Sequence, residues 1–301
     1  MRENGYNQHR LAAHAANDRS PTLSPQGNKI LFLSNRNSSN DQAYVMNLDG
    51  SGLHYVSVPV FEVNSAQWSP DGERIIMDCN SGASWDLYTS SADGSDFTVL
   101  PNTAAPANNP VWSPDGKRIA FVTTVSGHDT IGVLSADGGT YTNILEHLPE
   151  VNAFDNTAPD WCPDGGRIAF VSADGTGQLD IYIVNSDGTG LMNLTRTATA
   201  YEDAPRWAPD GKRIAFRSRA SSGGNNRIRI MAADDGTVLD NGADYGGREN
   251  SFSWSPDGKR IVFSTNRDGG SYKLYIMNAD HSGLIPMTQG SSAEQNPFWG
   301  R

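Results

Sequence analysis

The stretch Trp-Ser-Pro-Asp-Gly-Lys-Arg-Ile-Ala-Phe, residues 112–121, decides the fold of this chain. Proline presets the first central position of a tight turn, aspartate suits the second, and glycine supplies the left-handed residue that closes a bulged hairpin. The apolar run that follows has the length of a strand buried on both faces. The stretch therefore predicts a β-hairpin.

The same hairpin recurs along the whole sequence. A tryptophan precedes five of the six copies, Leu23 replaces it in the first, and a partial copy stands at residues 296–299. A second strand, an Asp-Gly turn and a short polar strand follow most copies, so each unit contains four strands. The prolines of the six copies are spaced 45, 44, 49, 46 and 47 residues apart and are Pro25, Pro70, Pro114, Pro163, Pro209 and Pro256.

Four-stranded units at this period are typical of a β-propeller, in which neighbouring blades bury each other's faces. No amphipathic helical spacing is visible, so we expect an all-β fold. We predict a single propeller domain over residues 1–301 with six blades and with extra strand segments at 4–12 and 296–301. The alternatives are an incomplete seventh blade and a chain that is part of a longer propeller.

Composition excludes several classes of function. The chain has 34 acidic and 23 basic side chains, a net charge of −11, which disfavours nucleic acid as a partner. No apolar run approaches the ~18 residues of a membrane span, so we expect no membrane insertion, and the N-terminal residues do not resemble a signal peptide. Motifs for a nucleophile elbow, a zinc protease or a phosphate-binding loop are missing. We therefore expect no cofactor, no metal and no catalytic residue.

The repeats of the form Pro-x-Trp-Ser-Pro-Asp-Gly-Lys-Arg-Ile-Ala-Phe, followed by Asp-Ile-Tyr and Asp-Gly, resemble the propeller of the TolB-like family. Residues 110–121 and 159–188 are the closest copies. The resemblance implies WD-like repeats, most often in six blades, and occurrence in bacterial envelope proteins and in the gating domains of some serine peptidases. It favours a periplasmic or extracellular location, although the sequence itself leaves the compartment open.

Residues at the start of each innermost strand should surround one mouth of the central channel, on the face that carries the variable loops. These residues are polar with an acidic bias, which suits a cation, a basic peptide or a hydroxyl-rich ligand, although a wet channel also requires polar walls. The candidates are Asp18, Arg19, Asn64, Asn108, Asn156, Thr157, Glu202, Asp203, Glu249, Asn250 and Glu294.

Aromatic residues on the same loops are further candidates for partner contacts, or else pack the loops onto the blades. They are Phe61, Trp85, Phe154, Tyr201 and Tyr245, whereas the tryptophans of the repeat should pack between blades. The six histidines share no repeat position, and we expect them at the surface.

The leading hypothesis is a monomeric, non-enzymatic module that binds a protein or peptide, with a small molecule or sugar as another possible ligand. One alternative is a carbohydrate-active hydrolase or lyase, for which Asp155, Glu202, Asp203 and Glu249 would be the acid and base candidates. Another is an accessory domain of a larger peptidase or sensor.

Overall fold

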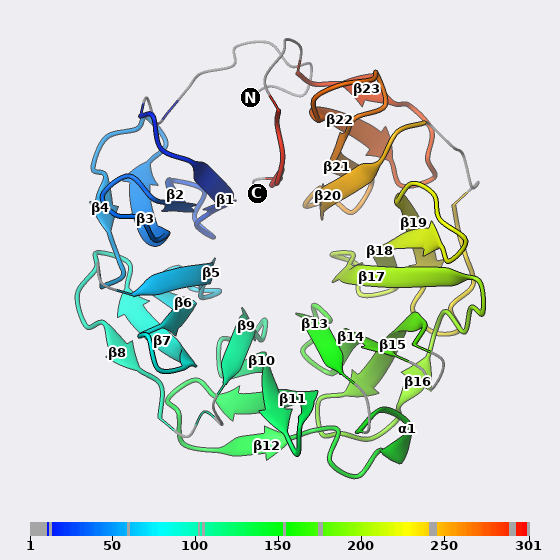
Figure 1. Cartoon of the computed structure of the whole chain (residues 1–301), viewed down its shortest axis with the longest axis horizontal. Helices are drawn as coiled ribbons and strands as arrows, with labels where there is room; N and C mark the ends of the chain where they lie inside the picture. The colour runs from blue at the N-terminus through cyan, green and yellow to red at the C-terminus, as the bar shows by residue number, and fades with distance from the viewer. Residues whose placement is uncertain are drawn as a thin grey trace.

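Six antiparallel sheets are arranged in a ring around a common axis, as Figure 1 shows, which confirms the all-β propeller. The computed structural model describes Leu11 and residues 14–58, 61–101, 103, 106–152, 155–173, 177–240, 246–288 and 293–299. Most of the predicted segment 4–12 and residues 300–301 therefore lie outside the described residues. No helix among the described residues is long and apolar enough to span a membrane.

Each blade follows one strand order, from the innermost strand at the channel to the shortest strand at the outside. Blades 1 and 2 contain β1(Asp18–Leu23), β2(Lys29–Ser34), β3(Gln42–Asn47), β4(His54–Tyr55), β5(Glu62–Trp68), β6(Arg74–Asn80), β7(Trp85–Ser91) and β8(Thr98–Val99). Blades 3 and 4 contain β9(Ala107–Trp112), β10(Arg118–Val125), β11(His128–Ser135), β12(Tyr141–Asn143), β13(Asn156–Trp161), β14(Arg167–Ala173), β15(Leu179–Asn185) and β16(Met192–Asn193).

Blades 5 and 6 contain β17(Ala200–Trp207), β18(Arg213–Ala220), β19(Arg227–Ala232), β20(Glu249–Trp254), β21(Arg260–Thr265), β22(Lys273–Asn278) and β23(Ile285–Pro286). In blade 5 the fourth strand is reduced to one bridge between Met231 and Val238. A single helical turn, α1(Pro149–Asn152), lies in the connection between blades 3 and 4.

The repeated motif forms the predicted hairpin. In blade 3 the Gly116 N–H donates to Ser113 O over 2.9 Å, and Gly116 has a φ of +68°. The Ser113 hydroxyl donates to Asp115 Oδ1 over 2.6 Å, and the Lys117 N–H donates to the same atom over 3.0 Å. The Ser113 hydrogen bond is the largest of the effects that hold the pKa of Asp115 below its usual value. Such turn aspartates explain a part of the negative charge.

A bulge interrupts each innermost strand near the channel. In four of them a non-glycine residue with φ near +50° stands directly before proline, namely Ser20, Asn109, Ala158 and Ala204. Such a conformation is unusual for a residue with a side chain, and a bulge turns the following residues of the strand. Asn296, before Pro297, has the same conformation, with φ of +54°. At this position the C-terminal segment therefore has the same local conformation as four of the innermost strands.

Five apolar clusters each join two consecutive blades, from the pair 1 and 2 to the pair 5 and 6. Each contains one tryptophan of the repeat, which confirms that these side chains pack between blades. They are Trp68, Trp112, Trp161, Trp207 and Trp254, and none is more than 8% exposed.

The boundary between blade 6 and blade 1, which we call the seam, differs from the other five. Among the described residues the apolar cluster on this side of blade 1 contains blade 1 residues alone, and that of blade 6 adds only Trp299. The segment 293–299 lies at the inner edge of the seam (Figure 1), where Ser251 Oγ and Ser253 Oγ accept the N–H groups of Asn296 and Trp299. The described part of the predicted C-terminal strand segment, residues 296–299, thus lies beside blade 6 but is not assigned as a strand.

Candidate functional site

The eleven candidate channel-mouth residues can be placed in the fold. Ten of the eleven are on the innermost strands β1, β5, β9, β13, β17 and β20, and Glu294 is in the segment 293–299. Figure 1 shows these strands at the inner edge of the ring. Their individual environments differ strongly, and these differences decide which of them can meet a partner.

Three of the candidates are buried and hold the blades together. Asn156 is fully buried, and its amide donates to Val151 O and to Asp129 O, each over 3.0 Å. Glu249 is 2% exposed, and its Oε2 accepts the backbone N–H of Ile228 in blade 5 over 2.6 Å. A buried hydrogen-bonded group of this kind fixes structure and is not accessible to a ligand.

Glu202, the third, is 2% exposed at the boundary of blades 4 and 5. Thr197 Oγ1 donates to both carboxylate oxygens over 3.0 and 2.9 Å, and Ser218 Oγ donates to Oε1 over 3.2 Å. Burial raises the pKa of Glu202 to about 7, and the nearby carboxylate of Asp180 acts in the same direction. A carboxyl with such a pKa has the property of a general acid, but this one is closed off from solvent.

Other charged candidates are neutralised by basic or acidic neighbours. Asp18 pairs with Arg36 over 2.8 Å, and Arg19 pairs with Asp41 over 2.6 Å. Asp203 accepts two hydrogen bonds from Arg217, over 2.6 and 2.8 Å. Because these pairs cancel charge, the predicted acidic bias of the mouth is smaller than the sequence suggests.

The remaining five candidates are intermediate or high in exposure. Four of them carry an amide or a hydroxyl side chain, and the fifth is Glu294. Asn64 donates to Asp78 over 3.0 Å, and Asn250 Oδ1 accepts from Arg217 over 2.9 Å. The other three, Asn108, Thr157 and Glu294, are of intermediate exposure.

Asp78 is a structural residue that the motif analysis missed. It is fully buried on β6, where its carboxylate accepts from the N–H and hydroxyl of Ser65 over 2.6 and 2.7 Å. It also accepts from the Asn64 side chain and from the Asn109 N–H over 3.1 Å. Asp78 thus fixes the bulges of two neighbouring innermost strands. A charged residue inside the apolar run Ile75–Cys79 is the sequence signal that could have identified it.

A pocket of about 210 Å³ opens beside Asp203 in blade 5. The guanidinium of Arg219 lies over the ring of Tyr201, with 5.5 Å between its Cζ and the ring centroid. The pocket combines an aromatic ring, an exposed cation and an amide at the loop end of the blades. Its lining residues are Leu179, Tyr201, Asp203, Arg217, Ser218, Arg219 and Asn226.

The other aromatic candidates lie elsewhere. Phe61 packs against Tyr88 and Phe97 in the boundary of blades 1 and 2, so it has a packing role. Trp85 is half-buried on β7, whereas Phe154 and Tyr245 lie outside the described residues. The expectation of surface histidines is wrong for His281, which is 3% exposed and stands at a turn position with φ of +62°.

The four carboxylates considered for acid–base chemistry have separate environments. Asp155 is exposed, and its Oδ1 accepts the Asp129 N–H over 3.2 Å and lies 3.9 Å from His128 Nδ1. Of the four, Asp203 alone lines the pocket. Within the part of the chain that the structure describes, no cluster of His, Cys, Asp and Glu could hold a metal ion.

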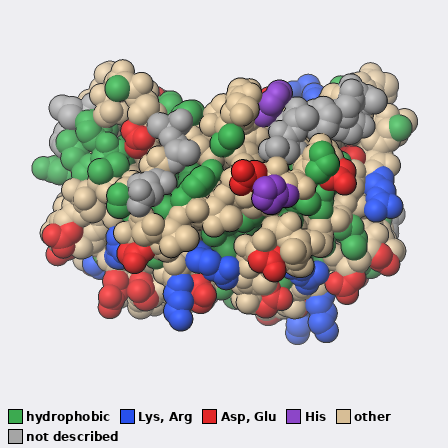
Figure 2. Space-filling view, turned by 90° about the horizontal axis from the view of Figure 1, so that it is seen from below, with side chains coloured by type: hydrophobic (Ala, Val, Ile, Leu, Met, Phe, Trp, Pro, Cys, Tyr) green, Lys and Arg blue, Asp and Glu red, His purple; other side chains and the backbone are tan. Residues whose placement is uncertain are grey.

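Charge is unevenly distributed over the outer wall of the ring. Figure 2 views the molecule edge-on and shows that acidic and basic side chains gather along its lower rim, whereas the upper rim carries few. On this side of the ring the two rims therefore differ in charge.

The sequence matches the profile described as the TolB beta propeller domain, over residues 1–152 and again over 78–252. Among solved structures, TolB from Acinetobacter baumannii is similar, with 22% identity, a TM-score of 0.63, and coverage of 91% of this chain and 67% of that chain. No curated protein matches the sequence significantly.

Enzymes share the same fold. Oligogalacturonate lyase from Vibrio parahaemolyticus has 14% identity and a TM-score of 0.72, over 94% of this chain and 82% of the lyase. A puromycin-hydrolyzing peptidase of Mycobacterium tuberculosis has 16% identity and a TM-score of 0.71, over 93% of this chain and 48% of the peptidase. At these identities the likeness concerns the fold alone.

Proposed function

The chain belongs to the TolB beta propeller domain family, and from this membership we propose that it is a binding module for a protein or peptide partner. The pocket at Tyr201 and Arg219 is the observation that supports this best. It presents an aromatic surface and a charged group on a rigid sheet, which is a common composition of protein interaction hot spots.

The charges of this pocket favour a partner with a carboxylate. Arg217 is engaged by Asp203 and Asn250, whereas Arg219 stacks on Tyr201 with its side chain exposed. An acidic side chain that approaches Arg219 would gain a charge-assisted hydrogen bond, and an apolar neighbour could pack on Tyr201. We therefore propose a partner segment that combines an acidic and an apolar residue.

Capture from bacterial lysate and envelope extracts, followed by cross-linking to locate the contact, tests this function. Arg219→Glu should lose the captured partner, and Tyr201→Ala should weaken its binding. Lys117→Glu, the same charge reversal at an exposed hairpin of blade 3, is the control and should retain it. Equal capture by Arg219→Glu and by the unaltered chain would refute this pocket as the binding site. The buried Glu202 and Glu249 are poor choices for such a test, because their substitution would disturb the fold.

The enzyme alternative has the fold of oligogalacturonate lyase as its support. A screen of polysaccharides and glycosides as substrates separates the two functions. Turnover by the unaltered chain that is retained in Arg219→Glu would favour an enzyme over a binding module. The accessory-domain alternative has the peptidase likeness as its support, since this chain spans about half of that protein.

A further inference from the structure

Two buried carboxyl groups lie beside the pocket at Tyr201 and Arg219, which we call the Tyr201 pocket. Glu202 on β17 is 2% exposed, and Asp180 on β15 is 3% exposed. Burial raises the pKa of Glu202, and a side-chain hydrogen bond with Asp180 acts in the same direction. Since an ionised carboxylate only accepts hydrogen bonds, this bond requires a proton on one of the two groups. The two carboxyls thus form a pair that can share one proton.

One residue of the connection between blades 4 and 5 bonds to both carboxyls. Thr197 donates its N–H to Asp180 Oδ1 over 3.2 Å, and its hydroxyl donates to both carboxylate oxygens of Glu202. Asp180 also accepts from the Asn193 amide over 2.8 Å and from Thr195 Oγ1 over 2.9 Å. The pair and its donors therefore join blade 4 to blade 5.

This pair is directly connected to the lining of the pocket. Ser218 lines the pocket and donates its hydroxyl to Glu202 Oε1 over 3.2 Å. The sequence neighbours of the two acids also line it, namely Leu179, Tyr201 and Asp203. Because Leu179 belongs to blade 4 and the other three to blade 5, the pocket spans the boundary that the pair joins. A displacement of one blade relative to the other would change the shape of the pocket.

The other charged groups on the elements packed against the pair have partners of their own. In blade 5, Arg217 bonds to Asp203, and Arg219 lies over the Tyr201 ring. On the connection, the Arg196 side chain donates to a backbone carbonyl over 3.0 Å. Among the described residues, the charged group that acts on the pKa of Glu202 is Asp180. Loss of the shared proton would place two negative charges together in a buried site, which is unfavourable.

We propose that this pair is a pH-sensitive switch of the Tyr201 pocket, which keeps the pocket formed while it holds the shared proton and weakens partner binding when the proton is lost. This inference rests on the proposed function of the pocket. A second negative charge beside the pocket would also repel an acidic partner segment, so both effects have the same sign. With a pKa of about 7 for Glu202, the protonated fraction falls about tenfold between pH 6 and pH 8.

NMR spectra of the full chain without a partner test the switch itself. The signals of Leu179, Tyr201 and Ser218 should move together between pH 6 and pH 8, with the midpoint of the Glu202 carboxyl carbon. Glu202→Gln, whose neutral amide replaces the protonated carboxyl, should abolish this common titration. Asp180→Asn removes the neighbouring charge and should move the midpoint to lower pH. Lining signals that do not titrate, or that titrate unchanged in both variants, would overturn the proposal.

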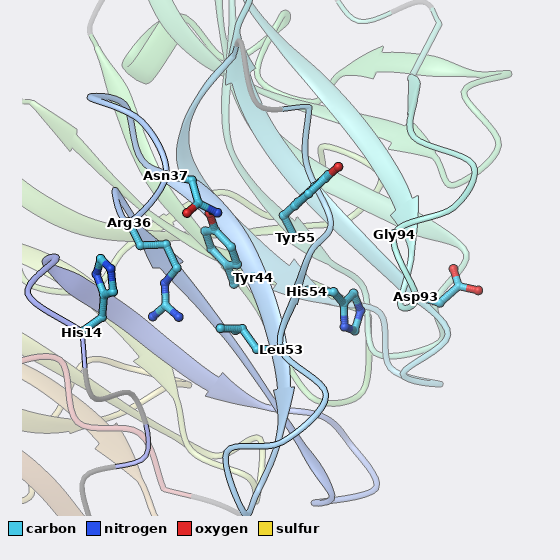
Figure 3. A pocket seen from close by; sticks show the side chains of 9 residues that line it. All are labelled: His14, Arg36, Asn37, Tyr44, Leu53, His54, Tyr55, Asp93 and Gly94. Atoms are coloured by element: carbon cyan, nitrogen blue, oxygen red, sulfur yellow. The ribbon is translucent and has the colours of Figure 1, made fainter.

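A second pocket, of about 670 Å³, provides an internal control in the same spectra. Its lining side chains include His14, His54 and Tyr55, as Figure 3 shows. Because histidine side chains titrate in this pH range, the Tyr55 signals report histidine titration. They should behave alike in the unaltered chain and in Glu202→Gln. If they changed, the variant would be disturbed as a whole, and the midpoint in Asp180→Asn would decide.

A titration with acetyl-aspartyl-leucinamide, which carries an acidic and an apolar side chain, tests the effect on binding. The unaltered chain should bind this probe up to about tenfold more weakly at pH 8 than at pH 6. Glu202→Gln should bind it equally at both, and Glu62→Gln, at an exposed glutamate of β5, should keep the dependence. Equal binding by the unaltered chain at both pH values would overturn the switch. No binding at either pH would contradict the proposed function, and the titration without a partner would still decide the switch.

Discussion

The guanidinium of Arg118 lies over the indole ring of Trp161, with 4.7 Å between Cζ and the ring centroid, and the two residues belong to consecutive blades. Arg118 also donates to Ser186 Oγ and to Gly165 O, each over 2.9 Å, so its planar group is held on three sides. The same pair recurs at four other boundaries, as Arg74 with Trp112, Arg167 with Trp207, Arg213 with Trp254 and Arg260 with Trp299. The repeated motif thus supplies both residues of each contact: its arginine lies over the tryptophan of the next copy.

Trp161→Ala should lower the free energy of unfolding by about 3–5 kcal/mol, because it leaves a cavity in a cluster formed by two blades. Trp299→Ala, in which the lost ring packs among the described residues on the blade 6 cluster, should cost less than half of this. Urea unfolding of both variants measures the difference. Equal losses would mean that the seam is packed as firmly as the other boundaries.

Asp78→Ala should lower the free energy of unfolding by about 3 kcal/mol, because four donors lose their acceptor in a buried place. Asp115→Ala, which removes an exposed turn carboxylate with two donors, is the matched control and should cost about 1 kcal/mol. Thermal and urea unfolding compare the two. A cost for Asp78→Ala no larger than for the control would contradict the anchoring role.

Glu202 should make stability depend on pH. Its pKa rises from 4.5 to about 7 on folding, so between these values the folded state retains a proton that the unfolded state has lost. The free energy of unfolding should therefore fall by about 1–3 kcal/mol as the pH rises through this window. Glu202→Gln, which carries no titrating group, should remove this decrease.

Urea unfolding at pH 5 and pH 8 measures the effect of Glu202. Glu62→Gln, at an exposed glutamate of β5, is the control and should keep the pH dependence of the unaltered chain. The same slope for Glu202→Gln and for this control would exclude Glu202 as its source.

Two turn glycines should respond differently to alanine. Gly116 has a φ of +68°, and an added Cβ would lie 3.7 Å from Pro70 Cδ, so Gly116→Ala should cost about 1–2 kcal/mol from the backbone alone. At Gly188, with φ of +87°, the Cβ would lie 2.7 Å from Ile144 O in the preceding blade, so Gly188→Ala should cost more. Calorimetry measures the loss of stability in both variants. If the contact between blades 3 and 4 were loose, Gly188→Ala would cost no more than Gly116→Ala.

The period and turn chemistry were sufficient to predict the blades, their four strands and the role of the tryptophans, because each is encoded within a single repeat. The environment of the candidate mouth residues was not predictable from the sequence. Glu202 and Asp203 are neighbours in sequence, yet the first is buried and the second forms an ion pair at a pocket. Their partners Thr197 and Arg217 stand at positions outside the motif.

The seam gives the ring a mechanical property. Five boundaries are closed by apolar clusters of two blades, whereas at the sixth the segment 293–299 interacts with blade 6. Among the described residues this boundary has no apolar cluster shared by two blades, so we expect a small rotation there to leave the five others packed. We expect force applied across the channel to separate blade 1 from blade 6 first, so the diameter available to a partner would be set by the last seven described residues of the chain.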